Sequence, residues 1–309
     1  MSQRSTAVAT HSAEEIARRR YLEDTTWRRV RRATGDFIRR RPLGTVGAVI
    51  VILMILGAVF AEQVAPYTDE EAIFTGLPTP PSAEHWLGTD GFGRDVLSRL
   101  IRGSQTALAV GFISSIVGST LGLVFGVVGA YFGGKIDELI QRIMDVLISF
   151  PLIVIAIAIV AALGPGQTGS VIAAITLPVI PRVARVVRAS GLAVVRMPYI
   201  EAARAVGVRA PRIMLRHIAP NVFAPYLIMM TAFLGQAILL EASLSFLGLG
   251  AVEPAPAWGL MLRGQGMTFL DQAPWLAIAP GVAISLSVFG FNLFGDSLRD
   301  ALDPRLRTA

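Results

Sequence analysis

Cysteine is absent from this 309-residue chain, which excludes a disulfide framework and any chemistry that needs a thiolate. Only three histidines occur, and they are too dispersed in the sequence to indicate a metal site. No serine stands in a G-x-S-x-G nucleophile elbow, so hydrolase chemistry is not indicated. Charged residues are also scarce, at 16% of the chain, against about 25% in an ordinary soluble domain. With 53% hydrophobic residues, the composition predicts a membrane protein.

A nucleotide-binding loop is present only in part. Residues 129–135 read GAYFGGK, which matches the front of the phosphate-binding pattern GxxxxGK. That pattern requires serine or threonine at the next position to hold magnesium, and Ile136 stands there instead. The run also follows an apolar segment rather than a strand. We therefore expect this chain to bind no ATP or Mg²⁺, to carry no cofactor or metal, and to have no catalytic residue.

Six apolar segments are long enough to cross a bilayer, which takes about 20 residues. They predict an all-α, polytopic membrane protein with six transmembrane helices, near residues 42–61, 105–131, 139–163, 169–187, 222–248 and 274–293. In the second span Gly118, Gly122 and Gly126 recur every four residues, which predicts close packing against another helix. Pro151 and Pro178 are expected to kink the third and fourth spans.

The lysines and arginines are distributed unevenly along these spans. If the N-terminus is cytoplasmic, 24 of the 28 lie in cytoplasmic segments and 4 in outer segments. The positive-inside bias therefore predicts that both termini are cytoplasmic. Because the arginines cluster beside apolar runs, the net charge of +6 indicates membrane topology, with contacts to lipid, rather than nucleic acid binding.

The spans divide the chain into four predicted regions. These are an arginine-rich cytoplasmic tail over 1–41, a first transmembrane helix with an extracytoplasmic loop over 42–104, a five-helix core over 105–297 and a cytoplasmic tail over 298–309. The core includes a cytoplasmic loop over 190–221, the longest one between spans.

The most informative part of that loop runs from residue 197 to 221. Pro198 suits the first turn of a short helix, and Gly207 suits the left-handed residue that closes it. The small side chains of Ala202, Ala203 and Ala205 would let another backbone come close. Helices this short are marginal alone, because isolated helices need roughly 12–15 residues. We expect a partner on the cytoplasmic side to hold them; the alternative is an amphipathic helix lying on lipid headgroups.

Polar side chains within the apolar spans form a second candidate site. Glu241 and Asn292 are costly in hydrocarbon, so they should face the bundle interior or a water-filled path. With Ser243 and Ser245 they are candidates for a translocation path or gate. The alternative is a buried hydrogen bond between helices, which would stabilise the bundle without touching a solute.

The loop also carries a family signature. The pattern E-A-A-x-x-x-G at 201–207, with Pro220 downstream, resembles the coupling loop of ABC importer permeases. One position departs from it, because Ala219 stands where leucine usually precedes the proline. Over residues 41–307 the chain resembles the second, C-type permease subunit of dipeptide, oligopeptide and nickel importers. The matching blocks are RPLG at 41–44, LGTD at 87–90, GRD at 93–95, SR at 98–99, GAYFGG at 129–134, DVLISFP at 145–151, RHIAPN at 216–221, EASLSFLGLG at 241–250, WG at 258–259 and NLFGDSLRDALDP at 292–304. Residues 1–40 lie outside.

This resemblance implies a type I ABC importer permease fold and a set of partners in the bacterial plasma membrane. A homologous permease would pair with this chain, two ABC ATPases would bind ATP and Mg²⁺, and a solute-binding protein would deliver di- or oligopeptides from outside. The implied ATPase-coupling residues are Glu201, Ala202, Ala203, Arg204, Gly207, Arg209 and Pro220. The outer loops 62–102 and 250–273 would meet the binding protein, with candidate contacts at Asp90, Arg94, Asp95 and Trp258; Trp258 is also a candidate interfacial anchor.

Other functions remain open at this point. The same architecture could import nickel chelates, glutathione or another small solute, because the binding protein largely selects the cargo. A secondary transporter or channel would need no ATPase. Against that stand the coupling loop, the few intramembrane acids and the lack of a visible inverted repeat. A membrane-bound enzyme is the third class, and no catalytic constellation supports it.

Overall fold

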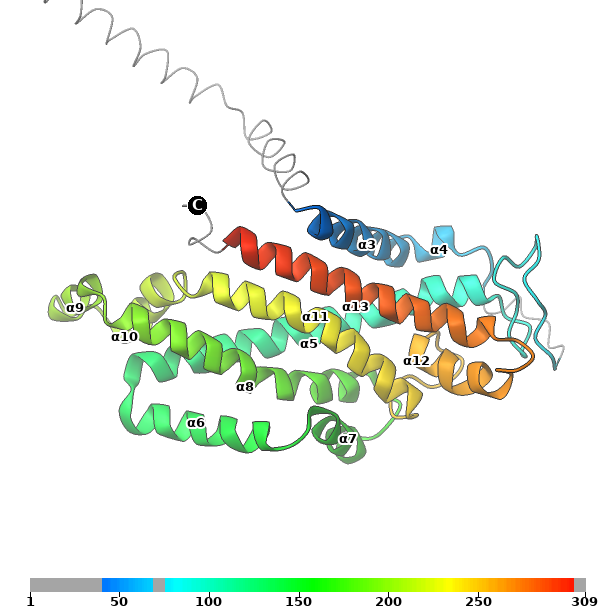
Figure 1. The fold of residues 1–309 in the computed structure, drawn as a ribbon. Coiled ribbons are helices and arrows are strands. Elements are labelled where there is room, and N and C mark those ends of the chain that lie inside the picture. Colours follow the sequence, from blue (N-terminus) through cyan, green and yellow to red (C-terminus); the bar gives the residue numbers. More distant parts are fainter. Residues whose placement is uncertain (1–40, 69–75, 303–309) are drawn as a thin grey trace, which may run out of the picture.

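The computed structural model describes residues 41–68 and 76–302, and this part of the chain is an elongated helical bundle without a β-strand (Figure 1). Its long helices are α3 (Pro42–Val59), α5 (Val96–Phe132), α8 (Thr168–Val195), α11 (Phe223–Phe246) and α13 (Trp275–Leu302). Shorter elements join them: α4 (Ala61–Val64), α6 (Gly134–Ser149), α7 (Leu152–Leu163), α9 (Pro198–Ala205), α10 (Ala210–Ile213), η2 (Met214–Ile218), α12 (Trp258–Met261) and η3 (Leu262–Gly266). The predicted tails, residues 1–40 and 303–309, lie outside the described residues.

Five helices of the described chain are long and apolar enough to span a membrane, and the predicted third span is broken. Helices α6 and α7 meet at an angle of 94°. The described chain has six spans only if this bent pair is counted as one. The break falls at Phe150 and Pro151 because proline lacks an N–H and forces the residue before it into extended backbone. The third predicted span is therefore not one helix. By contrast, α8 continues through Pro178 and Pro181 without a break.

Helix α5 begins nine residues before the predicted span. Asp95 caps its first turn by accepting a hydrogen bond from Ser98 N at 2.7 Å. Its 37 residues make α5 about 55 Å long, well beyond a hydrocarbon core of about 30 Å. The predicted boundary between residues 104 and 105 therefore falls inside one continuous helix.

The glycine repeat of α5 packs against α8, as predicted. A Cβ added to Gly118, Gly122 or Gly126 would lie 2.9, 2.7 or 2.8 Å from the Cβ of Val179, Val183 or Val187. The glycines thus let the two backbones approach to a distance that any larger residue would prevent. Two ion pairs join α8 to α6 on another side, Arg188 with Asp137 and Arg185 with Asp145.

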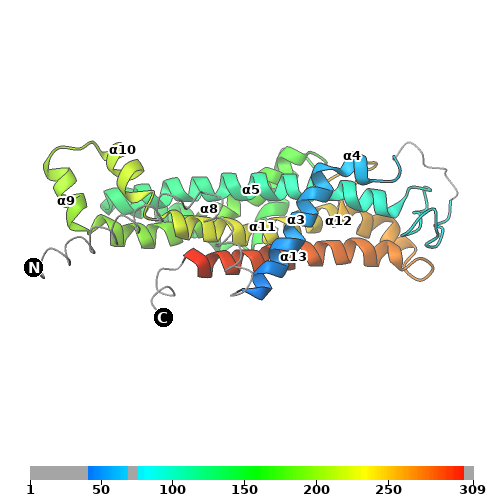
Figure 2. The ribbon, with the colours of Figure 1, turned by 90° about the horizontal axis from the view of Figure 1, so that it is seen from above.

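The two ends of the bundle differ in architecture. Helices α9 and α10 project beyond α8 at one end, while the loops around α12 and before α5 gather at the other (Figure 1). Seen from above, α3 crosses α13 on the outside of the bundle (Figure 2). The start of α3 and the end of α13 point toward the end that carries α9.

Candidate functional site

Residues 197–221 fold into the two short helices that the sequence predicts, followed by the π-helical turn η2. Pro198 occupies the first turn of α9, and Gly207 closes the helix with a φ of +79°. Gly207 N donates to Arg204 O and Val208 N to Ala203 O, each at 3.0 Å, so the last carbonyls of the helix are satisfied. Gly207 is needed here because other residues strain at this φ.

One face of this segment is anchored in the bundle. The side chains of Ile200, Ile213 and Ile218 are fully buried, and they share one apolar core with Val127 of α5 and Val187 of α8. From the sequence we expect a partner protein to hold these short helices. The chain's own core already fixes the segment to the long helices, and a partner on its other face stays a prediction.

Polar contacts add to this attachment. The guanidinium carbon of Arg204 lies 4.7 Å from the centre of the Tyr131 ring, and Arg204 Nη2 donates to Tyr131 O at 3.4 Å. Asn221 Nδ2 donates to His217 O at 2.6 Å and to the Tyr199 hydroxyl at 3.3 Å. Arg204, a predicted coupling residue, therefore contacts the end of α5.

The opposite face is open to solvent. All of the remaining predicted coupling residues except Ala203 are exposed. Ala203 is partly buried because it packs against the core. The exposed ones are Glu201, Ala202, Gly207, Arg209 and Pro220. Sequence reasoning missed two large apolar side chains here, Val206 and Leu215, which are 78% and 74% exposed. The sequence does offer a signal for them, because both are apolar residues within a loop rich in arginine. Val206 follows α9 and Leu215 belongs to η2, so both lie at the end of the bundle that carries α9 and α10 (Figure 1).

The predicted path residues divide into buried and exposed ones. Glu241 and Ser245 are buried, and Ser245 Oγ donates to Glu241 Oε1 at 2.7 Å. Ala251 N donates in turn to Ser245 Oγ at 3.3 Å, so this pair ties the end of α11 to the following loop. Neither residue lines an open path in this structure. Ser243 is partly exposed and Asn292 is exposed on α13; a role for them in translocation stays a prediction.

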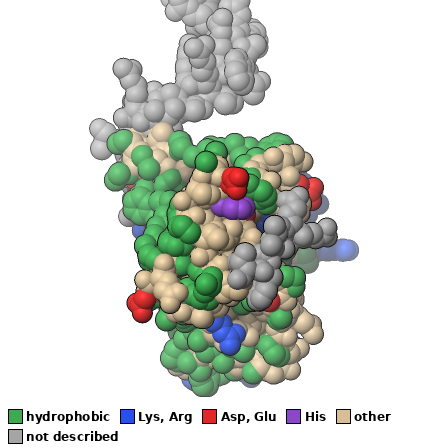
Figure 3. Space-filling view, turned by 90° about the vertical axis from the view of Figure 1, so that its right-hand side faces the viewer, with side chains coloured by type: hydrophobic (Ala, Val, Ile, Leu, Met, Phe, Trp, Pro, Cys, Tyr) green, Lys and Arg blue, Asp and Glu red, His purple; other side chains and the backbone are tan. Residues whose placement is uncertain are grey.

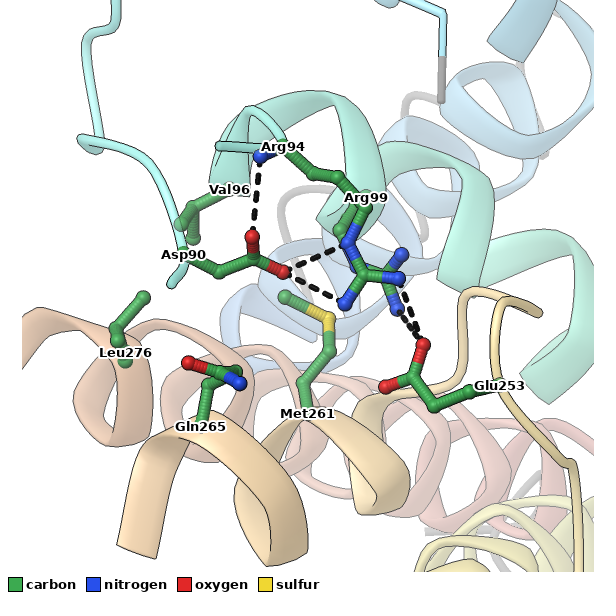
Figure 4. Close-up of a pocket in the computed structure, with 8 residues that line it drawn as sticks. All are labelled: Asp90, Arg94, Val96, Arg99, Glu253, Met261, Gln265 and Leu276. Atoms are coloured by element: carbon green, nitrogen blue, oxygen red, sulfur yellow. Dashed lines mark hydrogen bonds and ion pairs between the residues drawn. The ribbon is translucent and has the colours of Figure 1, made fainter. Parts of the chain in front are cut away.

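A cluster of charged side chains lies at the other end of the bundle (Figure 4). Arg94 donates to Asp90 Oδ2 from Nε at 2.8 Å, with Nη2 at 2.7 Å from the same oxygen, and it also donates from Nη1 to Glu253 Oε2 at 2.7 Å. Arg99 is buried beside it, with Nη2 at 3.5 Å from the same Glu253 oxygen. Burial lowers the pKa of Arg94, but hydrogen bonds to Glu253 and Asp90 outweigh it, so the pKa lies above its ordinary value. The guanidinium stays charged and joins the start of α5 to the loop before α12.

The residues predicted to contact a binding protein belong to this interior. Asp90, Arg94 and Asp95 are buried, and Asp95 Oδ1 lies 2.9 Å from His85 Nδ1. Trp258 is only 3% exposed and donates from Nε1 to Leu100 O at 2.9 Å, so its prediction as an interfacial anchor was wrong. These four side chains are buried inside the outer loops and hold them together through hydrogen bonds. Apolar side chains such as Leu77, Trp86 and Phe92 are exposed at this end, which Figure 3 faces.

The glycine run resembling a nucleotide-binding loop also has its place in the fold. Residues 129–135 join the end of α5 to the start of α6, with Gly133 and Gly134 at positive φ in the turn. No described strand precedes it, whereas a phosphate-binding loop connects a strand to a helix.

Comparisons with known proteins identify the family. Residues 118–308 match the model described as "Binding-protein-dependent transport system inner membrane component". Residues 25–81 match "N-terminal TM domain of oligopeptide transport permease C". The second match begins within the arginine-rich tail, so the family resemblance reaches further than the sequence analysis placed it.

Curated relatives agree with these models. The dipeptide transport permease DppC of Alkalihalophilus pseudofirmus is 42% identical over 275 residues, 88% of each chain. The glutathione transport permease GsiD of Escherichia coli is 42% identical over 270 residues, 87% of this chain and 88% of the relative.

A solved structure supports the fold. The MetNI methionine ABC transporter in an inward-facing conformation has a chain that aligns with a TM-score of 0.53 at 21% identity, covering 66% of this chain and 96% of that one. This likeness shows the type I importer architecture of the helical core. The chain belongs to the inner-membrane permeases of binding-protein-dependent ABC importers, in the C-type branch of the dipeptide and oligopeptide family, and is a multi-pass protein of the bacterial inner membrane.

Proposed function

We propose that this chain translocates di- and oligopeptides as one of two permease subunits, driven by ATPases docked on residues 197–221. The observation that carries the proposal is the two-sided character of that segment. One face packs into the apolar core of α5, α8 and α11, and the opposite face exposes Val206 and Leu215 to solvent. The names of the relatives, which transport dipeptides and glutathione, support a peptide-like cargo.

The ATPase partners would drive the cycle from outside this chain. The incomplete phosphate-binding loop, with Ile136 in place of a magnesium ligand, supports their being the subunits that bind ATP and Mg²⁺. When they close, they would displace α9 and η2, and the buried isoleucines would pass that displacement to the long helices. Alternating access is then a two-state equilibrium, which ATP shifts only by binding one state better than the other.

The remaining partners follow from the two ends of the bundle. The segment at 197–221 would face the cytoplasm together with both termini, as the distribution of arginines supports. The outer loops would then meet the solute-binding protein, and the homologous permease would cover helix faces left exposed here. Among the outer residues, Leu77, Trp86 and Phe92 offer the apolar contact area that the buried charged cluster does not.

Uptake by the complete complex tests this function. The complex would be purified with both permeases and both ATPases, reconstituted into liposomes, and supplied with its binding protein and ATP. We expect ATP-dependent accumulation of labelled dialanine, with glutathione and a nickel chelate measured in parallel. Accumulation of dialanine without ATP would contradict the ATPase coupling, and accumulation of the nickel chelate alone would contradict a peptide cargo.

A further inference from the structure

Two of the open grooves along the spans in the described part of the chain are equal in volume but differ in lining. Each has a volume of about 550 Å³, within the roughly 300–1,000 Å³ of ordinary small-molecule sites. The first lies between α3 and α13, and its two serines, Ser104 and Ser287, donate to carbonyls of their own helices. Its lining therefore presents a mainly apolar surface, as expected of a face that meets lipid chains.

The second groove lies along α11 and contains a polar side chain that the sequence analysis did not single out. Gln236 is exposed in the middle of α11 and hydrogen-bonds to no other residue in the described part of the chain. A carboxamide facing hydrocarbon would leave two donors and an acceptor unsatisfied, which is costly in lipid. Ser243 lies on the same groove, seven residues further along α11, and its Oγ donates to Leu239 O of its own helix at 2.7 Å, so Gln236 is the side chain by which the two linings differ.

The other groove-lining residues are apolar, and all but Ala242 and Gly281 are large. They include Leu239 and Phe246 of α11, Ile153 of α7 and Ile284 of α13. A wall of this kind accepts side chains of varied shape, while a carboxamide both donates to and accepts from a peptide bond. Gln236 and Ser243 are about 10 Å apart along the helix, which is about the length of three extended residues.

The position of α11 links this groove to both ends of the molecule. Its first turn follows directly on residues 197–221, where Val222 and Tyr226 share the core of Ile218. Near its other end, Ser245 Oγ accepts a hydrogen bond from Ala251 N, and the same loop supplies Glu253 to Arg94 and Arg99. A displacement at the proposed ATPase site would therefore reach the groove and, through Ser245, the loop that carries Glu253.

From this geometry we infer that the Gln236 face of α11 is the solute-contacting surface of this subunit, and that Gln236 recognises the peptide backbone of the cargo. The inference rests on the proposed function and sharpens it, because it moves the path from Glu241 and Ser245 to the opposite, exposed face of α11. Recognition through backbone amides explains how one groove would serve peptides with different side chains.

Because the chain contains no cysteine, an introduced cysteine is the only thiol of this subunit, and its modification can be read on this subunit alone. Gln236→Cys and Ser243→Cys would be placed in the complete reconstituted complex and treated with a charged, water-soluble methanethiosulfonate reagent. The matched controls are Ile238→Cys, buried on the same helix, and Ile52→Cys, exposed on the outer face of α3. We expect both groove cysteines to react, both controls to stay unmodified, and excess dialanine to slow the reaction at Gln236→Cys.

Uptake gives a second, independent readout. Gln236→Leu keeps the side-chain volume but removes the hydrogen-bonding groups, so we expect dialanine uptake to fall roughly tenfold. Gln236→Asn keeps the carboxamide and should retain more uptake than Gln236→Leu. The inference is overturned if Gln236→Cys is as unreactive as Ile52→Cys, or if Gln236→Leu imports dialanine like the wild type. Failure of the wild-type complex to import any peptide would instead overturn the proposed function.

Discussion

The two ends of this permease are held together by opposite means. At the proposed cytoplasmic end, three fully buried isoleucines attach residues 197–221 to the bundle, and apolar residues remain exposed on the far side. At the opposite end, buried charges hold the loops together, with Arg94 between Asp90 and Glu253. Apolar contacts are not directional, so this core can keep the segment attached to the long helices while those helices move. Ion pairs require one geometry and fix the outer loops in it.

The largest expected effect is on the outer cluster. Arg94→Ala would leave the Asp90 carboxylate buried without its partner, and breaking a buried pair costs about 3–5 kcal/mol. Thermal unfolding of the purified complex measures this loss. The matched control is Arg142→Ala, which removes an exposed pair with Glu138 and should cost less than about 1 kcal/mol. Equal stability of the two variants would show that the outer end does not depend on its charges.

The second effect concerns the attachment of residues 197–221. Ile213→Ala removes a fully buried side chain, which costs about 2–5 kcal/mol of local packing. We expect the ATPases to hydrolyse ATP while uptake falls, because the segment would move without carrying α11. The ratio of ATP hydrolysed to dialanine imported is the measurement. A ratio like that of the wild type would mean that this core does not transmit the displacement.

The third prediction compares one exposed valine at each end. Val206→Asp places a charge on the proposed ATPase surface and should lower ATPase co-purification and uptake roughly tenfold. Val252→Asp changes an exposed valine of the outer loop and should leave ATPase binding intact. Thermal stability should barely change in either variant, since both side chains lie at the surface. If Val206→Asp binds the ATPases normally, they dock elsewhere.

The smallest effect is expected at the contact between the segment and α5. Tyr131→Leu removes the ring under Arg204, a contact worth about 0.5–1 kcal/mol. Uptake should fall by no more than about fivefold, with a modest rise in ATP hydrolysed per solute. Phe132→Leu, at the neighbouring exposed residue, is the control. A complete loss of uptake in Tyr131→Leu would assign this contact a larger role than its geometry gives it.

Much of the fold could be predicted from the sequence because hydropathy reports local, additive properties. The start of α3, the break before Pro151 and the closing glycine at Gly207 all follow from a few adjacent residues. The bend of 94° between α6 and α7 could not be predicted, because a proline says where a helix breaks but not where the chain then goes. The early start of α5 was missed because Arg99 and Arg102 interrupt the apolar pattern there.

The candidate sites were harder to predict because they depend on pairings between distant residues. Arg94 meets Glu253 across 159 positions, so nothing local distinguishes it from an exposed arginine. Trp258 is common at membrane interfaces by type, yet its indole fills the space beside Gly103. Gln236 escaped notice for a different reason. An uncharged amide stands out less in an apolar run than the carboxylate of Glu241, and only the fold shows that Gln236 is exposed and Glu241 buried.

The length of α5 means that one rigid helix connects the two ends of the molecule. One stiff rod carries Tyr131, beneath the segment that would receive the ATPase, and Asp95, beside the loops that would receive the binding protein. If such a rod pivots where its glycines rest on α8, its two tips swing in opposite directions. Binding of a loaded binding protein at one tip and closure of the ATPases at the other would then both act on the same tilting motion of α5.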